Sequence, residues 1–248
     1  MNDFSQTFED RCEEIETYLD LLDSLERQVQ EGTPRLGGES GSIITVQQQR
    51  ILYSSVYLQL YNLVESTVKR CVEAVCVAVI RDHWRPNDLS NNVRREWVRF
   101  TAQTHIELNS ENRLESALSL CDHLVQILPI STFKIETGGG GNWDDKAIEK
   151  ISNRLGLSLS INPNIYEGIK RPFRDDKGAL TFVKSLRNDL AHGSLSFAEC
   201  GEGITVSELR DLFNLITLYL KEVVFCFKAS IDAHEFLLPA IRPQGVTG

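Results

Sequence analysis

The stretch that decides the fold runs from residue 51 to residue 80 and reads ILYSSVYLQLYNLVESTVKRCVEAVCVAVI. Its first half is rich in aromatic and aliphatic side chains, and its second half, CVEAVCVAVI, is apolar on nearly all sides. The apolar pattern predicts one long helix from about Val46 to His83, ended by Pro86 because proline cannot continue a helix. We expect this helix to be the most buried helix of the protein.

The segment before it predicts a second long helix, followed by a connector. Within residues 3–31 the apolar residues recur at intervals of seven, and two more fill the same stripe: Phe8, Ile15, Leu22 and Val29, with Tyr18 and Leu25. One apolar stripe on an otherwise acidic segment is typical of an amphipathic helix. We therefore predict an N-terminal helix within residues 1–32 and a flexible connector at 33–44, where glycines and Pro34 interrupt the pattern.

The remaining chain reads as further helices separated by loops. Helices are predicted at 87–105, 112–128, 143–156, 178–192 and 207–236. The last of these starts with Thr205 and Glu208 at the spacing of a capping box. Residues 130–142 and 193–205 read as loops, and 157–173 is ambiguous. The predicted fold is all-α, a bundle of long antiparallel helices in a single domain over residues 1–248, with its helical core at 45–236.

Overall charge and cysteine usage limit the possible functions. The net charge is −9 and the pI is about 5.1, whereas proteins that grip nucleic acid over their whole surface are usually basic. Only a local basic patch could contact RNA. The six cysteines contain no C-x-x-C pair, which favours reduced thiols in a cytoplasmic protein. The N-terminus does not resemble a signal peptide, and no apolar run reaches the ~20 residues that span a membrane.

The segment VKSLRNDLAHGSLSF, residues 183–197, carries the candidate chemistry. A helix turns by about 100° per residue, so Asn188 and His192 lie on one face, whereas Arg187 and His192 are about 140° apart. One regular helix cannot point both at a small ligand. Either the last turn relaxes at Gly193, or two copies of the helix assemble the site in a twofold dimer.

Such residues suit the cleavage of RNA by its own 2′-hydroxyl. Histidine transfers protons near neutral pH, and arginine offers a planar fork of donors to a phosphate. No metal-ligand spacing is present, so we expect neither a metal nor another cofactor. The alternative is structural: a histidine before a glycine is also typical of a helix C-terminus, where the helix dipole favours it.

The motif RNDLAH resembles the Arg-x4-His signature of HEPN domains, in which glycine often follows the histidine. The segments YNLVESTVKR, GGGGNWDDKAIEKISNRLGL and AHGSLSFAECG, in this order, are similar to one bacterial HEPN-like nuclease subgroup. The resemblance covers roughly residues 45–235. It implies a helical domain that dimerises through its motif helices and acts as a metal-independent endoribonuclease in toxin–antitoxin or phage-defence systems.

Carried over to this chain, the resemblance assigns catalytic roles to Arg187 and His192, and Asn188 would orient the histidine or contact phosphate. Glu65 and Asp189 would support the site. Some toxins of this type have a tyrosine two residues after the histidine, which a partner nucleotidyltransferase modifies. Here Ser194 occupies that position, so that form of neutralisation is not expected.

Positive charge gathers next to the motif. Residues 170–189 contain six basic and three acidic side chains. Four of the basic side chains are predicted to hold the RNA backbone: Lys170, Arg171, Arg174 and Lys184. A second basic group at residues 81–99, beside Trp84 and Trp97, fits either RNA binding or ordinary solvated helix faces.

The sequence thus predicts a homodimeric endoribonuclease with RNA as its substrate and an antitoxin or defence-system protein as a possible partner. The alternative is an inactive HEPN-type module that binds RNA, a nucleotide or a partner protein, which the acidic net charge favours. A third reading is an interaction scaffold that uses the stripe of helix 3–31.

Overall fold

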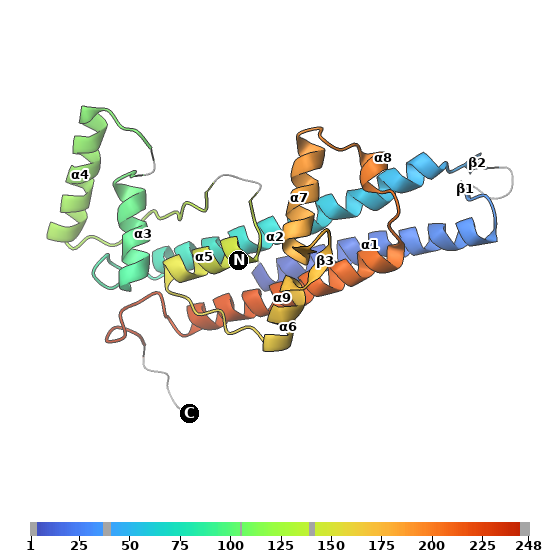
Figure 1. Ribbon diagram of the computed structural model, residues 1–248. Coiled ribbons are helices and arrows are strands. Elements are labelled where there is room, and N and C mark those ends of the chain that lie inside the picture. Colours follow the sequence, from blue (N-terminus) through green and yellow to red (C-terminus); the bar gives the residue numbers. More distant parts are fainter. Residues whose placement is uncertain (1–3, 37–40, 105, 139–141, 244–248) are drawn as a thin grey trace, which may run out of the picture. The chain divides into compact units, whose positions relative to one another are not determined.

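The computed structural model describes residues 4–36, 41–104, 106–138 and 142–243. Within these residues it contains nine helices, which make up 66% of the described residues. Figure 1 labels them in chain order. The four strands are two or three residues long. The prediction of an all-α fold is therefore confirmed. No helix in the described ranges is long and apolar enough to cross a membrane.

The helices, in chain order, are α1 (Phe4–Glu31), α2 (Val46–Arg81), α3 (Asn91–Thr101), α4 (Ser110–Val125), α5 (Asp145–Leu155), α6 (Pro163–Lys170), α7 (Ala179–Ala191), α8 (Phe197–Cys200) and α9 (Val206–Asp232). The strands form two antiparallel pairs: β1 (Arg35–Leu36) with β2 (Ser42–Ile43), and β3 (Pro172–Arg174) with β4 (Lys177–Gly178).

The chain divides into two compact units. Unit 1 consists of residues 1–67, 140–146 and 161–221, and unit 2 consists of residues 68–139, 147–160 and 222–248. The helices α2, α5 and α9 each contribute residues to both units. That the whole chain behaves as a single domain remains a prediction.

Helix α2 supplies more buried apolar side chains than any other helix, as its composition predicts. In unit 1 these include Tyr57, Leu60 and Leu63, and in unit 2 they include Cys71 and Val75. Side chains this apolar on several faces stabilise the protein only when other elements remove them from water. Helix α2 thus contributes to the apolar core of both units.

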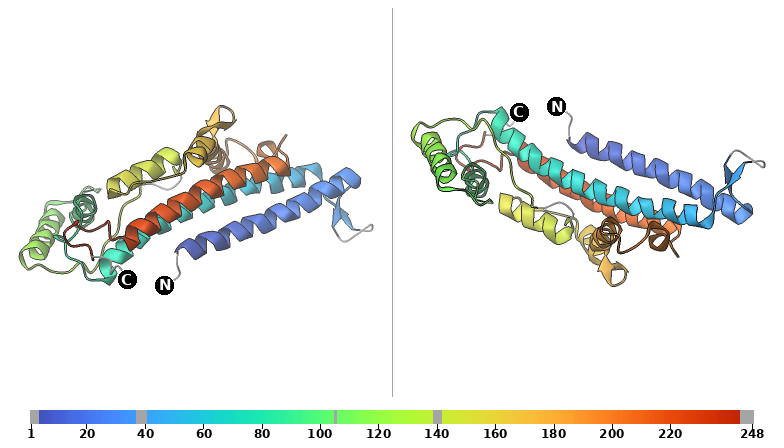
Figure 2. Two further views of the ribbon diagram at one scale, coloured as in Figure 1. Left: turned by 90° about the horizontal axis from the view of Figure 1, so that it is seen from below. Right: turned by 90° about the horizontal axis from the view of Figure 1, so that it is seen from above.

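Within unit 1, α1 lies beside the first parts of α2 and α9 (Figure 2). The predicted stripe of α1 faces inward, since Phe8, Ile15 and Leu22 are buried, whereas Val29 near the helix end is exposed. The Tyr18 hydroxyl donates a hydrogen bond of 3.0 Å to the carbonyl oxygen of Leu52 in α2. The heptad pattern therefore identified the packing face of α1, except at its last position.

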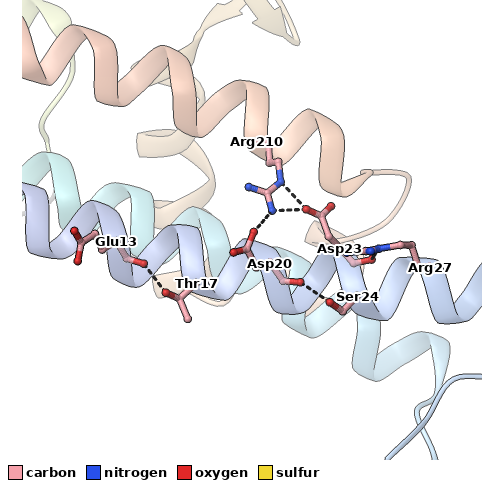
Figure 3. Close-up of polar contacts among 7 residues, drawn as sticks. All are labelled: Glu13, Thr17, Asp20, Asp23, Ser24, Arg27 and Arg210. Carbon is pink, nitrogen blue, oxygen red and sulfur yellow. Dashed lines mark hydrogen bonds and ion pairs between the residues drawn. The ribbon is translucent and has the colours of Figure 1, made fainter.

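An arginine of α9 joins α1 at the edge of this packing face (Figure 3). The Nε atom of Arg210 donates to Oδ2 of Asp23 at 2.6 Å, and its Nη2 atom donates to Oδ1 of Asp20 at 2.5 Å. Two carboxylates, one turn apart on α1, thus hold one guanidinium fork. Because Asp20 is mostly exposed, we expect these ion pairs to fix the orientation of α9 against α1 more than to raise the free energy of unfolding.

Two residues of the second basic group make structural contacts in unit 2. Arg94 donates hydrogen bonds to the backbone carbonyl oxygens of Pro86, Asn87 and Leu89, and Trp97 is buried. Ser90 caps α3 by accepting a hydrogen bond from the Val93 amide. Arg94 and Trp97 therefore hold the loop before α3 and the core of unit 2, which favours the structural reading for these two residues.

Two segments predicted to lack regular structure contain short elements. In the connector, residues 35–36 pair with residues 42–43; residues 37–40 lie outside the described ranges. The predicted loop 193–205 contains α8, which starts with a complete capping box between Ser196 and Glu199. The S-x-x-E spacing that predicts such a box is present in the sequence, so this helical turn could have been predicted.

The ambiguous stretch 157–173 also contains a helix. The Asn162 side chain accepts a hydrogen bond from the Asn164 amide and caps α6, and Pro163 occupies the first helical position, where a missing N–H costs nothing. Farther along the chain, Thr205 and Glu208 form the predicted capping box of α9. That helix ends at Asp232, earlier than predicted.

Two adjacent leucines of α1 test the packing of this helix. Leu22 is 0% exposed and Leu21 is 57% exposed. We expect Leu22→Ala to lower the free energy of unfolding by about 3 kcal/mol, because it opens a cavity between helices. The matched control Leu21→Ala should change it by less than about 0.5 kcal/mol. Urea titrations followed by circular dichroism measure both, and equal effects would contradict the described face of α1.

Candidate functional site

Helix α7 carries the predicted motif and is anchored in unit 1 by one apolar face. The buried side chains of this face are Ala179, Leu180, Phe182, Val183 and Leu190. The ring of Phe182 meets the ring of Tyr57 edge-on, with 5.8 Å between their centroids. The residues between Lys184 and Asp189 are half-buried at the margin of this face. The packing of α7 therefore fixes where the polar motif residues begin.

Arg187 is held by two neighbours. Its Nη1 atom donates a hydrogen bond of 3.1 Å to Oδ1 of Asn188, and its guanidinium carbon lies 4.9 Å from the ring centroid of Tyr61 in α2. A guanidinium over an aromatic face is attracted by the ring quadrupole. The Tyr61 hydroxyl in turn accepts a hydrogen bond of 3.2 Å from the backbone amide of Trp143. Arg187 is thus positioned by a buried, hydrogen-bonded ring.

The predicted supporting residue Glu65 lies close enough to Tyr61 for its charge to affect the pKa of the phenol. Burial raises the pKa of the Tyr61 phenol, and the charges of Glu65 and Asp144 raise it further, whereas Arg187 and the Trp143 amide act in the opposite sense. The phenol therefore stays neutral at physiological pH. Glu65 lies one helical turn after Tyr61, so both side chains share a face of α2.

His192 ends the motif helix at an exposed position. It is the C-cap residue of α7, with φ −90° and ψ −3°, and its amide donates to the Asn188 carbonyl at 2.9 Å. Gly193 follows with φ 71°, and the amides of Gly193 and Ser194 bond the carbonyl oxygens of Leu190 and Asp189. These two bonds form a Schellman motif, the usual helix ending that a left-handed glycine permits.

The helix ending therefore does not bring the two predicted catalytic side chains together. His192 keeps nearly helical dihedral angles, so it stays about 140° around the helix from Arg187. Among the described residues, no hydrogen bond, ion pair or ring contact joins the side chains of Arg187 and His192. The sequence left open two ways to form one site: relaxation of the last turn at Gly193, or a twofold dimer. The structure does not show the first of these.

Two of the four predicted RNA-binding cations are paired with acids. Lys184 Nζ bonds Oδ2 of Asp144, and Lys170 Nζ lies 3.8 Å from Oδ2 of Asp145. Both aspartates are buried and belong to the segment WDD at residues 143–145. The positive charge of Lys184 and Lys170 is therefore partly compensated in the free protein.

The other two predicted cations are exposed. Arg171 is the C-cap residue of α6 and Arg174 lies in β3, and both elements adjoin α7 within unit 1. The charge of Arg174 reaches Glu208 at the start of α9, where it is a minor cause of the lowered carboxyl pKa, after the hydrogen bonds from Thr205. Arg171 and Arg174 therefore offer side chains that a polyanion could reach.

The sequence reading missed the residues that position the motif. Tyr61 lies in the helix predicted to be the most buried, and the WDD segment begins the helix predicted at 143–156, yet they contact Arg187 and Lys184. One signal was available: Tyr61 precedes Glu65 by four residues, so any partner of Glu65 in the site could also meet Tyr61. Among the described residues, no group of three histidine, cysteine, aspartate or glutamate side chains is placed to hold a metal ion.

Comparison with known proteins gives one match. The family model described as HEPN_MAE_28990-like HEPN matches residues 2–236, which is nearly the whole chain. No curated protein and no solved structure matches the chain. The matched range includes α7 and every residue of the candidate site.

Gly193 offers a test of the helix ending that presents His192. An added Cβ would meet no atom within 4 Å, so only the backbone conformation at φ 71° opposes substitution. We expect Gly193→Ala to lower the free energy of unfolding by about 1 kcal/mol, because this conformation is strained for L-residues. Gly193→Asn should lower it less, since asparagine tolerates the left-handed region. Urea denaturation compares the two variants, and an Ala variant as stable as wild type would contradict the described ending.

Proposed function

Because the chain belongs to the HEPN_MAE_28990-like HEPN family, we propose that it is a metal-independent endoribonuclease whose active site is completed by a second copy of the chain. Membership of this family indicates a nuclease-like or RNA-binding module. The reaction, the dimeric site and the catalytic residues go beyond that and rest on the geometry of α7.

The observation that carries this proposal is the placement of Arg187. Its guanidinium lies over the ring of Tyr61 and is hydrogen-bonded to Asn188, on the helix that ends with the exposed His192. A cation fixed before the substrate arrives stabilises developing negative charge with little reorganisation. Asn188 and Tyr61 are therefore positioning residues in this proposal, and Arg187 contacts the phosphate.

The proposed reaction is an attack of the ribose 2′-oxygen on the adjacent phosphorus. His192 takes the proton of the 2′-hydroxyl as the O2′–P bond forms, and the P–O5′ bond breaks as the 5′-oxygen receives a proton from a second histidine or from water. Arg187 neutralises the charge on the pentacoordinate phosphate. The products are a 2′,3′-cyclic phosphate and a 5′-hydroxyl, so atoms and protons balance without a further reactant.

A second copy is part of the proposal because one α7 helix does not bring both groups together. Arg187 and His192 point away from each other by about 140° on the same helix. A twofold axis beside α7 would place the arginine of one copy opposite the histidine of the other. Both side chains lie outside the buried face of α7, so such a pairing would not require the helix to leave its unit.

The pairing of lysines with aspartates supports a second candidate, a module that binds without cutting. Lys184 and Lys170 already contact Asp144 and Asp145, and the chain carries a net charge of −9. Both features weaken the attraction of a long polyanion. A partner protein or a nucleotide would depend less on this charge than a long RNA.

We also propose a cytoplasmic role as a toxin or phage-defence effector, with an antitoxin or another defence protein as its partner. The six cysteines are free thiols. Burial raises the pKa of the Cys76 thiol to about 12, which keeps it protonated and unreactive. Free thiols of this kind suit a reducing compartment.

Cleavage of RNA by the purified full chain in the presence of EDTA tests the reaction. We expect His192→Asn and Arg187→Ala each to slow cleavage by about 100-fold or more, because each removes a group that acts in the transition state. The matched control is His83→Asn, since His83 is also exposed and lies far along the sequence from the motif. If the wild type cuts no RNA, or if all three variants cut equally well, the nuclease assignment is wrong.

Mixing the two inactive variants tests the composite site. A dimer of one Arg187→Ala chain and one His192→Asn chain keeps one intact arginine–histidine pair when the two groups come from different copies. Random exchange should then restore about a quarter of wild-type activity, since half of the dimers are mixed and each has one working site of two. If the mixture stays inactive although native mass spectrometry of differently tagged chains shows mixed dimers, a site shared in this way is refuted.

A further inference from the structure

Helix α4 in unit 2 has its apolar side turned outward. Ser116 is its only buried residue. By contrast, Val125 is 80% exposed, Leu118 is 49% exposed, and Leu114 and Cys121 are exposed as well. Helices of globular proteins normally bury their apolar face and expose their polar one. In α4 this arrangement is reversed.

The exposed apolar residues form one continuous stripe. At about 100° per residue, Leu114, Leu118, Cys121 and Val125 fall within an arc of about 60°. We call these four residues the α4 stripe. Ala117 and Leu124 extend it along one border.

The inner side of α4 is polar and packs on α3. His123 lies on the opposite side from the α4 stripe, and its ring meets the ring of Trp97 in α3, with 5.6 Å between centroids. Ser116, the buried residue, lies on the same side as His123. The attachment of α4 therefore does not use the α4 stripe, which is left to water.

Charge is distributed unequally beside the α4 stripe. Glu111, Glu115 and Asp122 fall within an arc of about 40° along one border, which we call the acidic edge. Arg113 is the one basic residue of α4 apart from histidine, and it lies beyond the other border. An apolar surface bordered by polar groups is typical of a protein interaction site.

We propose that the α4 stripe docks an amphipathic helix of a partner protein, in which lysine or arginine residues border the apolar face. Two helices pair when their apolar stripes meet and the flanking charges are opposite. Three carboxylates on one edge select cations on the partner at the matching positions. This surface lies in unit 2, so the docking proposal does not depend on whether the protein cuts RNA at the α7 site.

Charge argues against a second copy of α4 as the occupant. In an antiparallel pair each edge meets the same edge of the other helix, so Glu115 and Asp122 would face acidic residues. In a parallel pair the acidic edge would meet the opposite border. There Arg113 would be the one basic side chain available to three carboxylates. An anionic membrane surface would repel the acidic edge as well.

Two synthetic helical peptides with the full-length protein test this proposal. Both carry the same leucine stripe, and one has lysines and the other glutamates beside it. Fluorescence anisotropy measures affinity, and the rate of alkylation at Cys121 in a Cys200→Ser background reports occupation of the α4 stripe. We expect the lysine peptide to bind at least about tenfold more tightly and to slow alkylation at Cys121, with an advantage that shrinks as salt rises.

Three variants make the test specific. Replacing Glu111, Glu115 and Asp122 together by lysine should reverse the preference between the peptides. Leu118→Asp should weaken binding of the lysine peptide about tenfold or more. The matched control is Leu218→Asp in α9, because Leu218 is also 49% exposed and does not lie on α4. It should leave binding unchanged.

Several outcomes would overturn the proposal. Equal affinity for both peptides, no binding of either, or equal effects of Leu118→Asp and Leu218→Asp would each do so. Self-association seen by light scattering and lost in Leu118→Asp would identify a second copy as the occupant instead. Sedimentation with phosphatidylcholine vesicles that Leu118→Asp abolishes would identify a lipid surface. Because the Leu118 side chain lies outside the packing of α4, circular dichroism should show an unchanged fold in this variant.

Discussion

The need to bury α2 shapes both units of this protein. Its apolar side chains cover several faces of the helix, so one neighbouring helix cannot remove them all from water. In unit 1 they pack with the stripe of α1, with the apolar face of α7 and with the beginning of α9. The polar residues on these neighbours can then lie only at the margins of the packed faces. This explains why the charged motif residues of α7 lie at the margin of its buried face.

The same burial gives the candidate site its rigidity. Tyr61 belongs to the buried surface of α2, yet its ring supports Arg187 and its hydroxyl accepts a bond from the Trp143 amide. A guanidinium supported by a loop side chain would sample more orientations. His192 differs, because it stands at the end of α7 beside Gly193, where side chains reach solvent. One helix thus carries a fixed cation and an exposed imidazole.

Local signals in the sequence predicted most of the fold. The long helices follow from apolar spacing, and the capping box at Thr205 follows from a pair of residues three apart. The same spacing at Ser196 was present but not used, and that segment was predicted to be a loop. The support of the site could not be predicted in this way. Tyr61 and Arg187 are 126 positions apart and Asp144 and Lys184 are 40 apart. Which of many tyrosines or aspartates meets a given cation depends on how the helices pack, and periodicity does not contain that information. The exposure of the α4 stripe could not be predicted for the same reason, since apolar spacing predicts a helix but not which side of it is buried.

The lysine–aspartate pairs beside α7 have a consequence for how ionic strength acts on a bound polyanion. When free lysines bind phosphate, salt ions condensed on the nucleic acid are released, and the entropy gained makes affinity fall steeply with added salt. Lys184 and Lys170 already have carboxylate neighbours, so a phosphate would have to displace Asp144 and Asp145. The displaced carboxylates would then attract cations from solution and offset part of this release. Association through these two lysines should therefore vary less with salt than the number of basic side chains suggests, and the exposed Arg171 and Arg174 would set most of the slope.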